Sequence, residues 1–181
     1  MAERYEFFAA SYGGPITHVG LDVGGTLTSR TAPISSDLAQ RALTDEAVEV
    51  IKQLDEELDL TLMILSNTVG PSQDRNRALA AAGVAHRFIA EGVLQSHELN
   101  VSKPDPAFFE RALKVARCDS PASYLVVGNN LRNDVLPAVS LGMRAVLVGP
   151  QPRRGIPSGA TYINSIIELP YLMGMPRRRD A

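Results

Sequence analysis

The chain has 181 residues, of which 45% are hydrophobic and 21% are charged. This composition is typical of a globular protein and excludes a disordered or fibrous class. The 18 Lys and Arg residues against 20 Asp and Glu residues give a net charge of -2, so no broad basic surface for nucleic acid or an anionic membrane is expected.

The spacing of apolar residues predicts the elements in chain order. Apolar runs typical of buried strands occupy residues 17–21, 60–65, 87–90, 124–127 and 144–148. Thr44 can cap a helix over residues 47–58, and Pro106 suits the first turn of a second helix. Strands that alternate with helices indicate an α/β fold around a mainly parallel sheet.

Polar side chains follow three of these strands closely. Asp22, Ser66 and Asn129 each come at or just beyond the end of an apolar run. In an open parallel sheet, ligands gather beyond the carboxyl ends of the strands. We therefore expect the three side chains to converge on one crevice, which Lys103 can reach from a loop.

The first chemical segment, residues 21–28, places Asp22 at a strand end, ahead of two glycines. Glycines let the backbone approach a ligand closely. A carboxylate there can attack phosphorus and form an acyl phosphate, provided that nearby cations and N–H groups offset the repulsion between anions. A strand followed by a glycine turn that Asp22 caps explains the same residues, so both interpretations stay open.

The second segment consists of Ser66 and Asn67, immediately after a strand. Their hydroxyl and amide groups could hydrogen-bond a phosphoryl oxygen. Small polar residues in this position also form turns or cap helices, and the segment alone favours that second interpretation.

The third segment, residues 101–109, holds Lys103 in a loop that Pro104 and Pro106 restrict. A lysine that is held in place can neutralise both a carboxylate and a phosphate. A solvated lysine in a proline-rich turn is the alternative.

The fourth segment, residues 124–135, runs from an apolar strand into a polar cluster around Asn129 and Asp134. Mg²⁺ prefers oxygen ligands and typically takes one or two carboxylates together with water and phosphate oxygens. Asp22 and Asp134 are the carboxylates available for it. A helix N-terminus that Asn and Asp side chains satisfy would need no metal.

In this order, the four segments resemble the four motifs of the haloacid dehalogenase superfamily, and the match extends over about residues 17–149. Residues 102–113 and 127–144 resemble the family well beyond the catalytic positions. The resemblance implies a Rossmann-like three-layer sandwich with a central, mainly parallel sheet.

The resemblance also implies roles for individual residues. Asp22 stands at the nucleophile position and Lys103 at the position of the stabilising cation. Ser66, with Thr26 nearby, stands where the family binds phosphate. We expect Thr26, Ser66 and Asn67 to bind the phosphate of the substrate. These roles describe a phosphohydrolase that forms an aspartyl-phosphate.

Two positions depart from the family pattern. Gly24 stands where phosphatases of this family carry a general acid, which typically supplies about 10² to 10⁴ in rate. Asn129 stands where the fourth motif begins its acidic pair, which leaves Asp134 as the remaining acid. The implied Mg²⁺ site then consists of Asp22, the backbone carbonyl of Gly24, Asn129 and Asp134, and its affinity is expected to be low.

No cap insertion is visible after the first or the second motif, so we expect a core without a sizeable cap domain. An open site suits a large substrate, or a small one that a neighbouring subunit encloses. The leading hypothesis is a Mg²⁺-dependent phosphohydrolase. A catalytically impaired binding or scaffolding protein is the alternative, and a metal-independent dehalogenase-like hydrolase comes third.

The remaining expectations concern location and partners. One cysteine, Cys118, cannot form an internal disulfide, and the N-terminus lacks the apolar run of a signal peptide. We expect a cytoplasmic protein with one domain over residues 1–181 and flexible ends at 1–15 and 176–181. Its partner would be a phosphorylated small molecule or macromolecule and not a membrane, and it could form a homo-oligomer.

Overall fold

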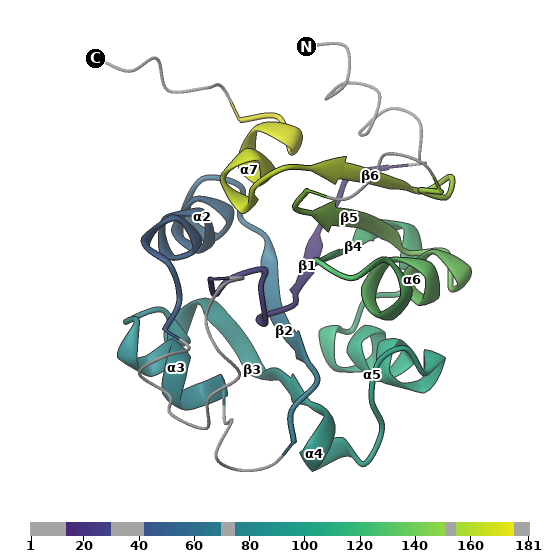
Figure 1. The fold of residues 1–181 in the computed structure, drawn as a ribbon, viewed down its shortest axis with the longest axis horizontal. Coiled ribbons are helices and arrows are strands. Elements are labelled where there is room, and N and C mark those ends of the chain that lie inside the picture. The colour runs from purple at the N-terminus through teal and green to yellow at the C-terminus, as the bar shows by residue number, and fades with distance from the viewer. Residues whose placement is uncertain (1–13, 30–41, 70–74, 151–154, 176–181) are drawn as a thin grey trace.

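The sheet at the centre of the molecule is the framework for the site. A computed structural model describes residues 14–29, 42–69, 75–150 and 155–175 of the chain. They form a six-stranded sheet in the order β3-β2-β1-β4-β5-β6, in which every pairing is parallel (Figure 1). The strands are β1 (His18–Leu21), β2 (Thr61–Ser66), β3 (Phe88–Gln95), β4 (Tyr124–Gly128), β5 (Arg144–Val148) and β6 (Ala160–Ile163). The predicted α/β fold with a parallel sheet is confirmed.

The order of the strands creates one place where ligands are expected. The chain builds β2 and β3 on one side of β1 and then crosses to β4 on its other side. Leu21 lies opposite Ile64 of β2 and Val127 of β4. The residues that follow these three strands therefore meet at a topological switch point, which is the usual ligand site of such sheets.

Helices cover both faces of the sheet and make it a three-layer sandwich (Figure 1). On one face, α2 (Asp45–Glu56), α3 (Arg75–Ala81) and α7 (Leu169–Leu172) pack on an apolar cluster that includes Leu21 and Val127. On the other face, α5 (Pro106–Ala116) and α6 (Leu136–Ser140) pack on a second cluster. The remaining short helical segments are Ala85–Arg87, α4 (Ser96–Leu99), Pro121–Ser123, Leu131–Val135 and Ile166–Glu168.

The two predicted helices begin where their capping residues stand. The side chain of Thr44 accepts a hydrogen bond from the N–H of Ala47, at 3.2 Å, at the start of α2. Asp105 caps α5 in the same way, because its Oδ1 accepts from the N–H of Ala107 at 2.9 Å. Pro106 occupies the first turn, which needs no N–H from that residue.

Two strands differ from the prediction. β3 continues to Gln95 rather than ending near residue 90, because its register against β2 shifts between Leu62 and Ile64. Glu91 lies in the irregular stretch with φ of 61°, and such a bulge interrupts the alternation on which a sequence prediction depends. β6 was not predicted, since of its four residues only Ile163 is buried and the apolar signal is weak.

The two ends of the segment between Thr28 and Leu43 are hydrogen-bonded to each other. Thr28 and Leu43 form an antiparallel bridge, and the N–H of Thr44 donates to the carbonyl of Leu27 at 3.0 Å. Residues 30–41, in the stretch after the first motif where we expect no cap insertion, lie outside the described residues. So do residues 1–13 and 176–181 of the ends expected to be flexible. Within the described ranges, no helix is long and apolar enough to cross a membrane.

Candidate active site

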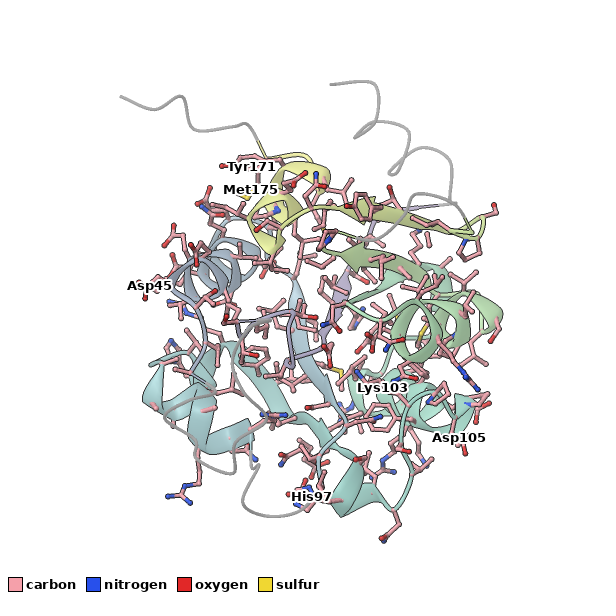
Figure 2. The ribbon with its side chains drawn as sticks, in the orientation of Figure 1. Asp45, His97, Lys103, Asp105, Tyr171 and Met175 are labelled. Carbon is pink, nitrogen blue, oxygen red and sulfur yellow. The ribbon has the colours of Figure 1, made fainter. Side chains whose placement is uncertain are left out.

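A buried lysine joins two carboxylates at the carboxyl edge of the sheet. Lys103 Nζ donates to Asp22 Oδ1 at 2.9 Å and to Asp134 Oδ1 at 2.6 Å. The Lys103 side chain is 3% exposed, against 11% for Asp22 and 2% for Asp134. The structure thus brings Asp22, Lys103 and Asp134 together, and the expected convergence of Ser66 and Asn129 on them stays a prediction. Lys103 lies inside the molecule and Asp105 on its surface (Figure 2).

Burial and charge act against each other in this cluster. Burial lowers the pKa of Lys103, but the carboxylates of Asp22 and Asp134 outweigh it and leave that pKa above its ordinary value. Burial raises the pKa of Asp134, with Lys103 opposing and Asp22 reinforcing the shift. The lysine is therefore held as a cation that can meet an additional anion.

The loop after β1 holds the carboxylate of Asp22 in a defined orientation. Thr26 Oγ1 donates to Asp22 Oδ2 at 2.9 Å, so Thr26 and Lys103 each bind one carboxylate oxygen. The N–H groups of Thr26, Leu27 and Thr28 all donate to the carbonyl of Val23, which makes the loop a tight turn. Thr26 therefore orients the candidate nucleophile, and its contact with phosphate stays a prediction.

Asn67 fixes the loop that carries the lysine. Its Nδ2 donates to the carbonyl of Lys103 at 2.8 Å, and its Oδ1 accepts from the N–H of Lys103 at 2.9 Å. Both ends of the amide are thus used on the Lys103 backbone. Asn67 was expected to bind phosphate; that contact stays a prediction beside this positioning role.

Ser66, the last residue of β2, lies beside a residue that the sequence analysis missed. Arg75 Nε donates to Ser66 Oγ at 3.0 Å, and Ser66 is 1% and Arg75 3% exposed. No local motif marks Arg75, which begins α3 well after the second segment. A charged residue at a helix start is ordinarily a surface residue, so only the tertiary structure reveals its position.

After β4, Asn130 caps the next turn and Asp134 binds Lys103. The Asn130 side chain accepts from the N–H groups of Arg132 and Asn133, at 3.0 Å each, and so caps the following turn. Asp134 instead points at Lys103, and its Oδ2 accepts from the N–H of Asn130 at 3.0 Å. Gly128 makes room for this, because a Cβ there would overlap the Asp134 carboxyl group.

The predicted ligands suit a hard cation in type but provide little charge. Asp22, the Gly24 carbonyl, Asn129 and Asp134 would supply oxygen donors from the loops after the neighbouring strands β1 and β4. Among the described residues, no three or more His, Cys, Asp or Glu side chains gather as a metal cluster. Two carboxylates with one lysine give the cluster a formal charge of about -1, so the residues fit Mg²⁺ with weak affinity.

The position of the missing acid is open with respect to the described residues. Gly24 is exposed, and no atom of the residues that the structure describes lies within 4 Å of a Cβ built on it. No described side chain therefore occupies the place of a Cβ at this position.

Comparisons with known proteins identify the family of the chain. The family model of haloacid dehalogenase-like hydrolases matches residues 35–142, more than half of the chain, and the match begins after Asp22. The chain is 42% identical over 89 residues to a phosphoserine phosphatase of Thermus thermophilus. That alignment covers 49% of this chain and 34% of the relative. It is 37% identical over 70 residues to a glyceraldehyde 3-phosphate phosphatase of Methanothermobacter thermautotrophicus. That alignment covers 39% of this chain and 30% of the relative.

The matched stretches thus span about a third of the length of these curated relatives. Among solved structures, the magnesium-bound HAD hydrolase YfnB of Bacillus subtilis superposes with a TM-score of 0.71 at 14% identity, over 89% of this chain and 100% of that one. This likeness supports the Rossmann-like fold. The family match over more than half of its length shows that the chain belongs to the haloacid dehalogenase-like hydrolase family.

Proposed function

We propose that the chain is a phosphohydrolase that works through an aspartyl-phosphate on Asp22. The observation that carries the proposal is the position of Lys103 Nζ, 2.9 Å from Asp22 Oδ1 and 2.6 Å from Asp134 Oδ1. The end of β1 contributes Asp22, a restricted loop contributes Lys103, and the helical segment Leu131–Val135 after β4 contributes Asp134. A buried cation beside a carboxylate is what an anionic substrate requires. The two phosphatase relatives support the same reaction class.

The reaction would proceed in two displacements. An oxygen of Asp22 forms a bond to phosphorus while the bond from phosphorus to the leaving oxygen breaks, and Lys103 offsets the charge of the two approaching anions. Water then attacks the phosphorus of the aspartyl-phosphate, which releases inorganic phosphate and restores the Asp22 carboxylate. Thr26, through its 2.9 Å bond to Oδ2, keeps the carboxylate oriented in both steps.

Mg²⁺ is the cofactor that we propose, held by Asp22, the Gly24 carbonyl, Asn129 and Asp134. When bound, it would neutralise phosphate charge and polarise a phosphoryl oxygen. The neutral amide of Asn129 in place of an acid predicts that the ion binds weakly.

The open position at Gly24 points to a class of substrate. Without an acid there, the leaving oxygen departs without the usual proton, which costs about 10² to 10⁴ in rate for an ordinary alkyl ester. Acyl phosphates, anhydrides and other compounds with good leaving groups need less help. We therefore propose that such compounds are hydrolysed faster than alkyl phosphates.

A second candidate is a binding or scaffolding protein with an impaired site. The observation that favours it is that Gly24 supplies no acid and no described residue lies within 4 Å of a Cβ there, while Lys103 already engages both carboxylates. A metal-independent dehalogenase-like hydrolase ranks third, because we expect no cap to enclose a small acid.

The setting of the activity is part of the proposal. We propose a single cytoplasmic domain over residues 1–181 without a sizeable cap, acting on a phosphorylated small molecule or macromolecule. A neighbouring subunit of a homo-oligomer would enclose a small substrate where a cap does so in other families of this fold.

The test is phosphate release from a panel of alkyl phosphates, acyl phosphates and anhydrides, with Mg²⁺ or with EDTA. We expect release that is fastest for the good leaving groups and that falls by a factor of about 10³ or more in Asp22→Asn, which lacks the nucleophile. Release that is equal in Asp22→Asn and in the unaltered protein would overturn the proposal in favour of a binding protein.

A further inference from the structure

A buried arginine lies beside the candidate phosphate-binding hydroxyl and has no part in the mechanism above. Arg75 is the first residue of α3 and is 3% exposed, although arginine is among the residues least often buried. Its Nε lies 3.0 Å from Ser66 Oγ.

The direction of this hydrogen bond determines what the Ser66 hydroxyl can do. Arginine Nε–H can only donate, so Ser66 Oγ must accept. The hydroxyl proton is thereby left to point elsewhere, and its recorded acceptor is the carbonyl of Asn67 at 3.5 Å, the outer limit for such a bond. A stronger acceptor, such as a phosphoryl oxygen, would readily take that proton.

The arginine is held in this position from a second strand. The fully buried Gln95, at the end of β3, accepts from the N–H of Arg75 through Oε1 at 2.8 Å. Gln95 Nε2 in turn donates to Glu98 Oε1 at 3.2 Å. The start of α3 is therefore anchored to β3 while the arginine side chain extends to the end of β2.

We propose that Arg75 is a positioning residue of the phosphate site, which orients the Ser66 hydroxyl to donate to the phosphoryl group. This inference rests on the proposed function, since it assumes that the carboxyl edge of the sheet at Asp22 and Ser66 receives a phosphate. The guanidinium also polarises the hydroxyl, because a donor bonded to a cation is a stronger donor. The chain would thus add a protein cation to a site in which one acid of the metal pair is neutral.

The test is a double-mutant cycle on the binding of inorganic phosphate, measured by calorimetry in EDTA. Arg75→Met and Ser66→Ala should each weaken phosphate binding about tenfold, the size of one modest charge-assisted hydrogen bond. The double variant should bind phosphate with the same affinity as the single variant that binds it less tightly, because Arg75 acts through Ser66. Arg77→Met, an exposed arginine on the same helix, is the matched control and should bind phosphate normally.

The proposal would be overturned if a folded Arg75→Met bound phosphate normally. It would also be overturned if the two losses of phosphate affinity multiplied in the double variant, or if the unaltered protein bound no phosphate at millimolar phosphate. A purely structural role would lower the Tm of Arg75→Met and leave its phosphate affinity unchanged. If Arg75→Met does not fold, Arg75→Lys serves in the same cycle, because it keeps the charge and removes the Nε donor.

This measurement separates the inference from the proposed function. Failure of the Asp22 chemistry would appear as an absence of turnover while phosphate affinity still depends on Arg75. Failure of the inference would appear as turnover that depends on Asp22 while phosphate affinity is indifferent to Arg75.

Discussion

The loops after β1 and β4 each lack one acid of the family pattern, but their surroundings differ. Gly24 is exposed, and a Cβ placed there would meet no atom of the described residues within 4 Å. In the loop after β4, the remaining acid Asp134 is 1% exposed and packs so closely on Gly128 that a Cβ would overlap it. A Cβ at Gly24 therefore fits without repacking of the described residues, whereas the position of Asp134 depends on the absence of a Cβ at Gly128.

This comparison indicates which departure affects chemistry and which affects the framework. The open loop has lost a group that acts only during the reaction. The packed loop retains the carboxylate that Lys103 needs, at 2.6 Å. Substitutions in the first loop should therefore change rates, and substitutions in the second should change stability as well.

Among substitutions at the two positions that lack an acid, the largest expected effect comes from restoring the acid at Gly24. Gly24→Asp should raise kcat/KM for an alkyl phosphate about a hundredfold, because a general acid can then protonate the leaving oxygen. Gly24→Asn, of equal size but without an acidic proton, is the matched control and should show no gain. Rates for acyl phosphates should change little in either variant.

Adding Asn129→Asp to Gly24→Asp should raise turnover further if the site has simply lost its acids, since the second carboxylate strengthens the proposed Mg²⁺ site. The measurement is phosphate release as a function of Mg²⁺ concentration. A double variant no faster than the unaltered chain would count against simple degeneration and favour a specialised site.

A smaller effect, of about 1 to 3 kcal/mol, is expected from crowding the packed loop. Gly128→Ala should lower the free energy of unfolding by that amount, because its Cβ must displace the Asp134 carboxyl group. Gly24→Ala should change it by no more than about 0.5 kcal/mol. Urea denaturation of the two variants in parallel measures both values, and equal losses would show that the contrast between the loops is wrong.

The sequence predicts the framework of this molecule better than its network of polar contacts. Strand runs such as residues 124–127 are continuously apolar because both faces of a parallel sheet are buried, so they stand out against any background. Asp22, Lys103 and Asp134 carry a strong motif pattern, and the structure brings all three together. β6 was missed because it lies at the sheet edge and is mostly half-buried.

The polar network is harder to predict because its partners are far apart in the chain. Ser66 and Arg75 belong to different elements, and nothing in the spacing between them shows that the arginine turns inward. Asn67 looks like a ligand residue in the sequence, yet its amide bonds to the backbone of a loop 36 positions away. Side chains that could bind either a ligand or the backbone are assigned only by the tertiary structure.

The smallest effect tests this last assignment. Asn67→Ala removes two hydrogen bonds to the Lys103 backbone, and because Asn67 is exposed and water can replace them, the free energy of unfolding should fall by only about 1 kcal/mol. The Lys103 N–H loses its acceptor, so its hydrogen exchange, followed by NMR, should accelerate. Exchange at Lys103 that stays unchanged while phosphate affinity falls would instead make Asn67 a phosphate ligand, as its position after β2 first suggested.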